Sequence, residues 1–372
     1  MSRALKIRYF AHSWVSDWNH GNAHFLRGLA RELVRLGHNV RCYEQLGSWS
    51  LKNLMHHEGE RAIEEIDDFR RSYPELDIHF YRDDAGFGDF IAEELKDADI
   101  VVIHEWNEPA IVNAILSFKR RYGFRTLFHD THHRAYTYPA GILKFHLHLF
   151  DGVLAFGEAL RRIYTDGFGI NRAWTFHEAA DIAIFHPLRV NKEFDVLWIG
   201  NWGDEERTRE LTEFLIEPAA TMTGSRFVVH GVRYPEAAVC KLRQAGIDFR
   251  GYLPNLKSPI AYAQSAIALH VPRRQYSNGL SGIPTIRVFE ALACGATLLC
   301  SPWQDSESLF RAGEDYLCVP DGAAMRSEMQ RLLRDDAARQ QLASNGLQTV
   351  ASRHTCRHRA EQLVDICEGL LQ

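Results

Sequence analysis

Two groups of residues in this sequence have the types and spacing needed to bind an anionic ligand and to move a proton. The first lies in the segment 281–296, where Pro284 and Gly295 bracket an apolar run with helical periodicity. Proline suits the first turn of a helix because its missing N–H would have no intrahelical partner there, and glycine suits the C-terminal stop. The segment therefore predicts a helix with an open N-terminus.

The start of this predicted helix is a candidate anion site. The unpaired N–H groups around Thr285 and Ile286, with the positive end of the helix dipole, favour a diphosphate. Arg287 adds a cation one turn in, and Glu290 lies on the same helix, six residues after Pro284. A carboxylate there is suited to accept hydrogen bonds from ribose hydroxyls. A well-capped helix with a solvated glutamate is the alternative interpretation of this spacing.

The second group is the segment 129–133, at the end of a predicted strand, with His129, Asp130 and His132 as candidate catalytic residues. Open parallel sheets place ligand-binding residues at the carboxyl ends of their strands. An imidazole or carboxylate there can bond a substrate hydroxyl or take its proton. The residue types also suit a metal, but adjacent side chains of an extended segment point in opposite directions, so we favour substrate contact. A satisfied structural cluster is the third interpretation.

Two more polar segments follow predicted strands. Gly21 and Asn22 lie in a turn after the first strand, and Glu105 and Trp106 come directly after 100–104. Glycine would let an acceptor or donor pass close to the backbone of this turn. Glu105 is an alternative base, and Trp106 a candidate acceptor contact. A plain strand-to-helix turn and a capped helix start are the corresponding structural interpretations.

Alternating strands and helices must position these groups. Short runs rich in Val, Ile and Phe alternate with longer amphipathic segments, which is typical of parallel strands and their crossover helices. The pattern is interrupted at 185–192, restarts near Phe194, and ends in helices only. The sequence therefore predicts an α/β fold with domains at 1–187 and 188–350. The C-terminal helix at 351–372 packs on its own domain or back on the first.

Length and composition limit the class of protein. A chain of 372 residues exceeds what one hydrophobic core usually organises. With a net charge of -5 and no polybasic segment, neither nucleic acid nor an anionic membrane is favoured as a partner. No apolar run is long enough to span a bilayer, and the seven cysteines contain no CxxC pair. We therefore expect a soluble, cytoplasmic protein of unspecified oligomeric state.

Several segments resemble the group 1, or family 4, glycosyltransferases. VFEALACGATLLCS closely resembles the donor-site helix of that family. GNWGDEER resembles the turn after the first strand of the donor domain, which contains Asn201 and ends at Arg207, the counterpart of an arginine that contacts the donor diphosphate. FHEAADIAIFHP resembles the interdomain segment, and TLFHDTHHRA is similar to the CgeB-like, spore-maturation branch.

This resemblance implies the GT-B architecture, in which two Rossmann-like domains present parallel sheets to a central cleft. It implies a transferase that moves a hexose from a UDP- or GDP-linked donor to a hydroxyl-bearing acceptor in glycan biosynthesis. It places Asn201, Arg207 and the helix start at 284–287, with Glu290, on the donor. His129 would lie near the reacting sugar. It also implies retention of configuration, no cofactor and no tightly bound metal.

One position departs from that family. Its members commonly carry two glutamates separated by seven residues; the second corresponds to Glu290, but the position of the first is Gly282. The identity of the sugar and the stereochemical outcome are therefore left open. Two other functions stay in consideration, a UDP-sugar epimerase of the same architecture and a nucleotide-sugar-binding protein without turnover.

Overall fold

The computed structural model describes residues 3–372, apart from the side chain of Asp204. Its contacts divide the chain into two compact units. Unit 1 comprises residues 1–178 together with 356–372, and unit 2 comprises residues 179–355. The C-terminal helix α18 (Cys356–Leu371) therefore belongs to unit 1, where it packs against α1 (Ala23–Arg35).

Unit 1 is built on a seven-stranded sheet whose described pairings are all parallel, in the order β3-β2-β1-β4-β5-β6-β7. The strands are β1 Lys6–Phe10, β2 Asn39–Gln45, β3 Asp77–Tyr81, β4 Ile100–His104, β5 Arg125–Asp130, β6 Gly152–Ala155 and β7 Ala173–Thr175. Strand order reverses between β1 and β4, and the loops that leave these two strands diverge there. Sheets of this kind bind ligands at that point.

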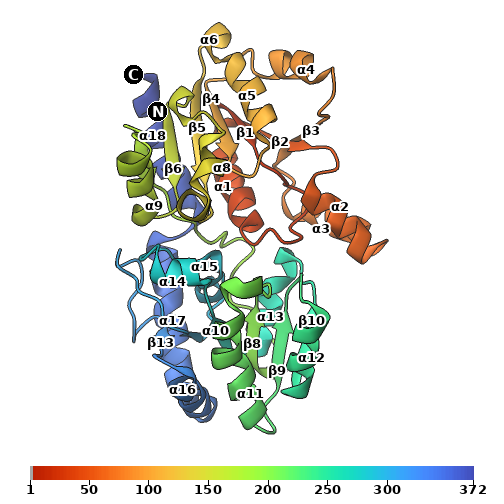
Figure 1. Cartoon of the computed structure of the whole chain (residues 1–372), viewed down its shortest axis with the longest axis vertical. Helices are drawn as coiled ribbons and strands as arrows, with labels where there is room; N and C mark the ends of the chain where they lie inside the picture. The colour runs from red at the N-terminus through yellow and green to blue at the C-terminus, as the bar shows by residue number, and fades with distance from the viewer. Residues whose placement is uncertain (1–2) are drawn as a thin grey trace. The chain divides into compact units, whose positions relative to one another are not determined.

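Helices connect these strands and cover the sheet (Figure 1). Besides α1 and α18 they are α2 Trp49–Glu58, α3 Arg61–Ser72, α4 Phe87–Glu94, α5 Pro109–Ser117, α6 Lys119–Tyr122, α7 Arg134–Thr137, α8 Pro139–Leu143 and α9 Glu158–Arg162. Helix α1 ends at Arg35 with Leu36 as its C-cap residue, and Gly37 follows with a φ of 91°, the left-handed conformation that glycine adopts without strain. A glycine directly after Leu36 predicts this helix end from the sequence, and the structure confirms it.

Unit 2 has a six-stranded sheet in the order β10-β9-β8-β11-β12-β13, and its described pairings are again parallel. Its strands are β8 Phe194–Ile199, β9 Phe227–His230, β10 Ile247–Gly251, β11 Ser265–His270, β12 Leu298–Cys300 and β13 Leu317–Cys318. Its helices are α10 Thr208–Leu211, α11 Glu217–Thr221, α12 Glu236–Gln244, α13 Ser258–Gln264, α14 Arg274–Asn278, α15 Ile286–Ala293, α16 Gly322–Arg334 and α17 Asp336–Arg353. A π-helical turn, Thr212–Ile216, joins α10 to α11.

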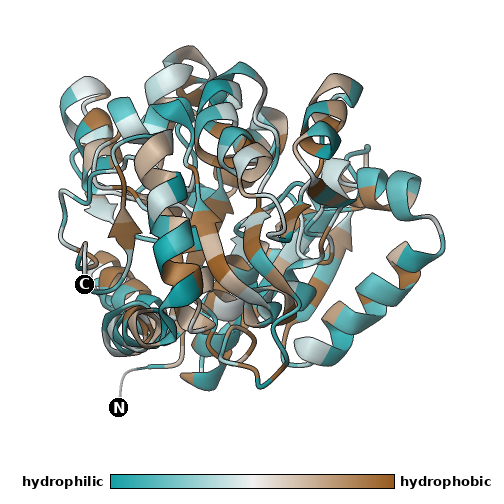
Figure 2. Cartoon of the chain, turned by 90° about the horizontal axis from the view of Figure 1, so that it is seen from below, coloured by the Kyte–Doolittle hydropathy of each residue, from teal (hydrophilic) through white to brown (hydrophobic). Residues whose placement is uncertain are grey.

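The cores form where apolar strand residues meet the inner faces of helices. In unit 2, Val196 and Trp198 of β8 are buried with Leu215 and Met325. Burying one such side chain contributes about 1.5–3 kcal/mol. Figure 2 shows this segregation, with apolar colouring concentrated on strands and hydrophilic colouring on the outward helix faces. The predicted α/β fold with two parallel sheets is confirmed.

Candidate functional site

Helix α15 in unit 2 begins at Ile286, with Thr285 as its N-cap residue in extended conformation (φ -75°, ψ 162°). The prediction that Pro284 occupies the first helical turn is wrong. Thr285 has an extended backbone and is the N-cap residue, so the first helical residue is Ile286 and Pro284 lies before the helix. The Thr285 hydroxyl makes no capping hydrogen bond but lies 3.0 Å from His270 Nε2. The side chain at the helix start is therefore turned towards the end of β11.

Arg207 reaches the same edge of the sheet from the loop after β8. Its Nη1 donates to the carbonyl of Val271 at 3.1 Å, and its guanidinium carbon lies 5.6 Å from the centre of the Trp198 ring. A Cβ at Gly203, whose φ is 74°, would lie 2.7 Å from Arg207 Nε. Only glycine therefore leaves room for this arginine in its observed position.

Arg207 forms no ion pair with the carboxylates whose side chains the structure describes. Among the carboxylates of residues 3–372 other than Asp204, none lies at ion-pairing distance from it, and its Nε is buried without a hydrogen-bond partner. Burial, and secondly the neighbouring Arg273, lower the pKa of Arg207 to about 9. Because a desolvated cation is stabilised by an opposite charge, this position favours a bound anion.

His270 links Arg207 to the start of α15 and was not among the predicted site residues. Burial, and secondly Arg207, lower the pKa of His270 to about 3, so its ring is neutral near pH 7. Its Nδ1 is buried and has no hydrogen-bond partner in the described part of the chain. A histidine that ends a buried strand was the signal available in the sequence.

Arg287 and Glu290 are paired with each other. Glu290 is fully buried, and its Oε2 accepts hydrogen bonds from Arg287 Nη1 at 2.5 Å and from the Tyr262 hydroxyl at 3.2 Å. The alternative of a solvated glutamate is therefore wrong. In this structure the Arg287 charge is balanced within the protein, which leaves Arg207 as the cation suited to a ligand. The ribose-binding role of Glu290 stays a prediction.

Two hydrogen bonds connect the loop before α15 to the loop after β12. Gly282 N donates to the carbonyl of Gln304 at 2.9 Å, and Trp303 Nε1 donates to that of Ile283 at 3.1 Å. Gly282 has a φ of 91°, and a Cβ there would lie 2.5 Å from Ser306 Oγ and 3.1 Å from Glu307 Oε1. Backbone strain and crowding together explain why a glutamate does not fit at this position.

The remaining donor candidates have mainly structural contacts. Asn201 is half-buried, and its Oδ1 accepts from Val232 N at 3.1 Å, which connects the ends of β8 and β9. Ile286 is buried at the start of α15. The donor-binding assignments of both residues stay predictions.

In unit 1, three of the predicted catalytic residues are fully buried: His129, Asp130 and Glu105. The Tyr9 hydroxyl lies 2.5 Å from His129 Nδ1, and Tyr164 donates its hydroxyl to Asp130 Oδ2 at 2.6 Å. Neither tyrosine was predicted. Because none of the three side chains is exposed to solvent, they are suited to orienting neighbouring residues of the site.

Thr131 connects the polar residues at the ends of β4 and β5. Its hydroxyl accepts from Asn22 Nδ2 at 2.6 Å, and it lies 2.9 Å from His104 Nε2 and 3.3 Å from Glu105 Oε1. Burial and the nearby Asp130 raise the pKa of Glu105 well above its ordinary value, and burial raises that of Asp130 to about 6. This pair therefore holds a proton more readily than solvated carboxylates do.

Trp106 and His132 lie closer to solvent. Trp106 is 40% exposed, with the His132 ring packed edge-on at 5.0 Å between centroids. The guanidinium carbon of Arg134 lies 4.0 Å from the centre of the Trp106 ring, and Arg134 also bonds the Glu105 carbonyl. Gly21 and Asn22 are half-buried in the turn before α1. Unit 1 thus gathers its predicted residues at the ends of β1, β4 and β5.

Two other kinds of feature are absent from the described residues. Among the side chains of residues 3–372 other than Asp204, no group of three or more His, Cys, Asp or Glu has an arrangement that could hold a metal ion. Over the same residues, no helix combines the length and apolar character needed to cross a membrane.

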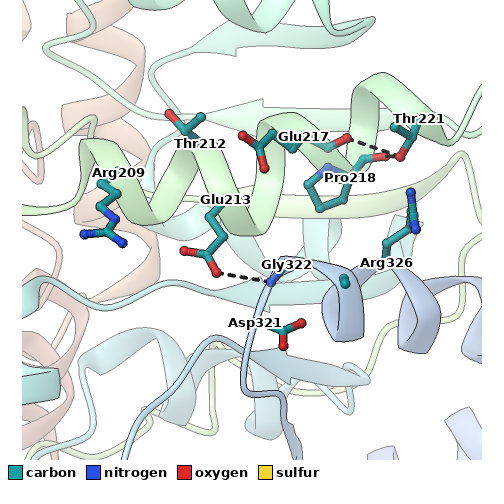
Figure 3. Close-up of a pocket in the computed structure, with 10 residues that line it drawn as sticks. Arg209, Thr212, Glu213, Glu217, Pro218, Thr221, Asp321, Gly322 and Arg326 are labelled. Carbon is teal, nitrogen blue, oxygen red and sulfur yellow. Dashed lines mark hydrogen bonds between the residues drawn. The ribbon is translucent and has the colours of Figure 1, made fainter.

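A separate pocket of about 850 Å³ opens in unit 2 (Figure 3). Its walls come from α10 and α11 with the turn between them, and from the start of α16. The Glu213 side chain accepts from Gly322 N across it at 3.3 Å. It is lined by Arg209, Thr212, Glu213, Glu217, Pro218, Thr221, Asp321, Gly322, Ala323 and Arg326. None of the predicted site residues is among them.

Part of this chain is similar in sequence to a known protein family, and the whole chain is similar in structure to solved proteins. Residues 207–365 match a family model described as glycosyl transferase-like. A search of curated proteins found no match. The segment that matches contains Arg207, His270 and all of α15.

Solved glycosyltransferase structures share the fold of the whole chain. A glycosyltransferase from Rickettsia africae has a TM-score of 0.68 at 12% identity, over 100% of both chains. Sucrose-phosphate synthase from Thermosynechococcus elongatus has a TM-score of 0.67 at 13% identity, over 99% of both. Anabaena HepE in complex with UDP and glucose has a TM-score of 0.69 at 12% identity, over 98% of this chain and 100% of that one. The chain therefore has the GT-B glycosyltransferase fold, and its residues 207–365 match a glycosyl transferase-like domain.

Proposed function

We propose that this protein transfers a sugar from a nucleoside diphosphate sugar to a hydroxyl-bearing acceptor. The observation that supports this most directly is the convergence, within unit 2, of Arg207 and the N-terminus of α15. His270 lies between them in the chain of contacts: it is 3.0 Å from the Thr285 hydroxyl, and Arg207 bonds the carbonyl of the next residue, Val271. A helix N-terminus beside an arginine suits a diphosphate.

The reaction follows from where charge develops. The bond between the anomeric carbon of the sugar and the diphosphate oxygen breaks, and the electron pair stays on the diphosphate. Arg207 and the helix end are placed to stabilise that negative charge, which strengthens in the transition state. The acceptor hydroxyl forms the new bond to the anomeric carbon and gives up its proton to a base.

Unit 1 is the proposed acceptor domain. Of its candidate groups, His132 lies nearest to solvent, whereas His129, Asp130 and Glu105 are covered. We assign the covered residues to orienting the site, with the Glu105 and Asp130 pair as the store for the proton that leaves the acceptor. Gly21 and Asn22 belong to the same acceptor side in this proposal.

Several finer features are part of the proposal. The donor is a UDP- or GDP-linked hexose, following the UDP complexes of Anabaena HepE and T4 phage BGT. Retention of configuration, independence of metal and the absence of a cofactor are proposed from the resemblance described above, as is the CgeB-like branch. Chelation with EDTA should leave turnover intact, and loss of activity that Mg²⁺ or Mn²⁺ restores would argue against metal independence.

One screen tests the proposed function. Thermal shift and calorimetric titration with UDP, GDP, dTDP and CMP, and with their sugars, should identify a ligand that raises the melting temperature. Product analysis then separates the alternatives. Transfer to an added hydroxyl compound supports the transferase, a sugar epimer of the donor identifies an epimerase, and tight binding without any reaction identifies a binding protein. Absence of binding by every nucleotide would overturn the proposal.

A further inference from the structure

Buried imidazoles at one end of the unit 1 sheet have ring nitrogens that the protein does not satisfy. His20 and His104 are 3% and 0% exposed, and His12 is half-buried. Among the described side chains, His12 Nδ1 and both nitrogens of His20 are buried without a hydrogen-bond partner, and His104 Nδ1, also without one, lies 3.6 Å from Glu105 Oε2. The Asn22 side chain lies beside His20 and opposes part of the fall in the pKa of His20. Buried polar atoms nearly always have a partner, so here it comes from outside the chain.

The three rings form one continuous group with an exposed indole. Ring centroids are separated by 4.1 Å between His12 and His20 and by 5.8 Å between His12 and His104. The Trp106 ring lies 6.3 Å from that of His12 and is 40% exposed. The polar nitrogens are therefore bordered by a flat apolar surface that solvent reaches.

The chemistry of these groups selects among ligands. A neutral imidazole offers one donor and one acceptor, and a hydroxyl group can complement either one. Burial lowers the pKa of His12 to about 4 and also lowers those of His20 and His104, so the rings are uncharged near pH 7. An array of neutral donors and acceptors suits a ligand with several hydroxyls better than a phosphate or an ammonium group. Arg134, a cation near His12 and His104, bonds the Glu105 carbonyl and is stacked on Trp106.

We propose that the acceptor is a carbohydrate, whose hydroxyls bind His12, His20 and His104 while its apolar C–H face stacks on Trp106. This inference rests on the proposed function, since it names the substrate class of the acceptor side. The indole presents the flat apolar surface that such stacking needs. A lipid acceptor needs an apolar channel, whereas this surface presents polar ring nitrogens. A protein acceptor offers a single hydroxyl and would leave most of these nitrogens without a hydrogen-bond partner.

The test uses the full chain and measures acceptor and donor separately. Saturation-transfer NMR and tryptophan fluorescence follow the binding of glucose, mannose, galactose, N-acetylglucosamine and their disaccharides. Release of nucleoside diphosphate, with and without each sugar, follows turnover. We expect at least one carbohydrate to bind and to accelerate release. Trp106→Ala should weaken its binding about tenfold, and Trp106→Phe should retain most of it.

Matched variants keep the result specific. Trp49→Ala removes another exposed tryptophan of unit 1, 53% exposed, and should leave acceptor binding unchanged. His12→Gln should reduce acceptor binding without changing the affinity for nucleotide. If nucleotide binds and is turned over but only a long-chain alcohol or a serine peptide accepts the sugar, this inference is overturned and the proposed function stands. Stoichiometric metal bound by the imidazoles would also overturn it, while failure of all nucleotides to bind would overturn the proposed function itself.

Discussion

His270 Nε2 and the Thr285 hydroxyl lie 3.0 Å apart, and this hydrogen bond determines how helix α15 begins. Because the hydroxyl is engaged by the imidazole, it does not cap the backbone N–H groups of the first turn. The same imidazole is close enough to Arg207 for its pKa to be lowered further by that cation. His270 thus fixes the cap residue, while Arg207 is fixed by its hydrogen bond to the carbonyl of the next residue, Val271.

Arg207→Ala should weaken nucleotide binding by about ten- to a hundredfold, the cost of losing a charge-assisted hydrogen bond. The melting temperature should not fall, because the substitution removes a desolvated charge that has no partner ion among the described side chains. Isothermal calorimetry with the nucleotide identified in the screen measures the first effect. Arg209→Ala, at an exposed arginine two residues on, is the control and should bind normally. Equal affinity in both variants would remove Arg207 from the site.

Glu290→Gln should destabilise the fold and not only weaken ligand binding. It leaves the Arg287 guanidinium beside a buried neutral group, and breaking a buried ion pair costs about 3 kcal/mol or more. Urea unfolding measures the loss. The double variant Arg287→Met with Glu290→Gln should recover part of it, since no unpaired charge then remains. A single variant as stable as the original protein would show that the pair contributes little.

Gly282→Glu should lower stability, although it restores the residue that the resembling family carries. The left-handed backbone and the close approach of Ser306 oppose any side chain there. Gly246→Ala separates the two causes, because its φ of 77° is comparable but its Cβ would meet no atom within 4 Å. We expect Gly246→Ala to cost about 1 kcal/mol and Gly282→Ala more, by thermal unfolding. Equal losses would mean that Ser306 and Glu307 move aside freely.

Stability should depend on pH through His270. Its folded pKa of about 3 lies below the ordinary value of 6.5, so between these values the unfolded chain binds a proton that the folded chain does not. Acidification below pH 6.5 therefore favours unfolding, by up to about 1.4 kcal/mol per pH unit for this group. Urea unfolding at pH 7.5, 6.0 and 5.0 should show a shallower loss for His270→Gln. Parallel curves for the two proteins would contradict the prediction.

The sequence predicted those features that depend on local periodicity. The apolar periodicity of residues 23–35 predicts a helix, and the apolar run at 100–104 predicts a strand. Helix α1 and strand β4 have these bounds. Helix α2 was missed, since Trp49–Glu58 has no clear apolar face, and its start depends on Ser48 accepting from Leu51 N. Strand β10, Ile247–Gly251, was missed because its alternation is short and ends in glycine.

The site was predicted less completely than the fold. Residues at strand ends were identified because the α/β pattern implies where they gather, as with Glu105 and His129. Their partners were not, because Tyr9 and Tyr164 come from positions that periodicity assigns to the core. Pairing of Arg287 with Glu290 was missed for a related reason. Residue spacing shows that two side chains share a helix face but not whether they bind each other or a ligand.

Helix α18 has a consequence for the order in which the protein can be completed during synthesis. Arg359 donates to the His177 carbonyl at 3.0 Å, Gln362 to that of Thr175 at 2.9 Å, and Arg125 to that of Leu370 at 3.0 Å. Unit 2 has all of its residues once Thr355 has left the ribosome, whereas unit 1, although begun first, still lacks the helix that covers α1. Unit 1, whose synthesis starts first, is therefore the last unit to have all of its residues. A fragment that stops near Leu188 would lack α18, and the apolar face of α1 would be exposed and prone to aggregation.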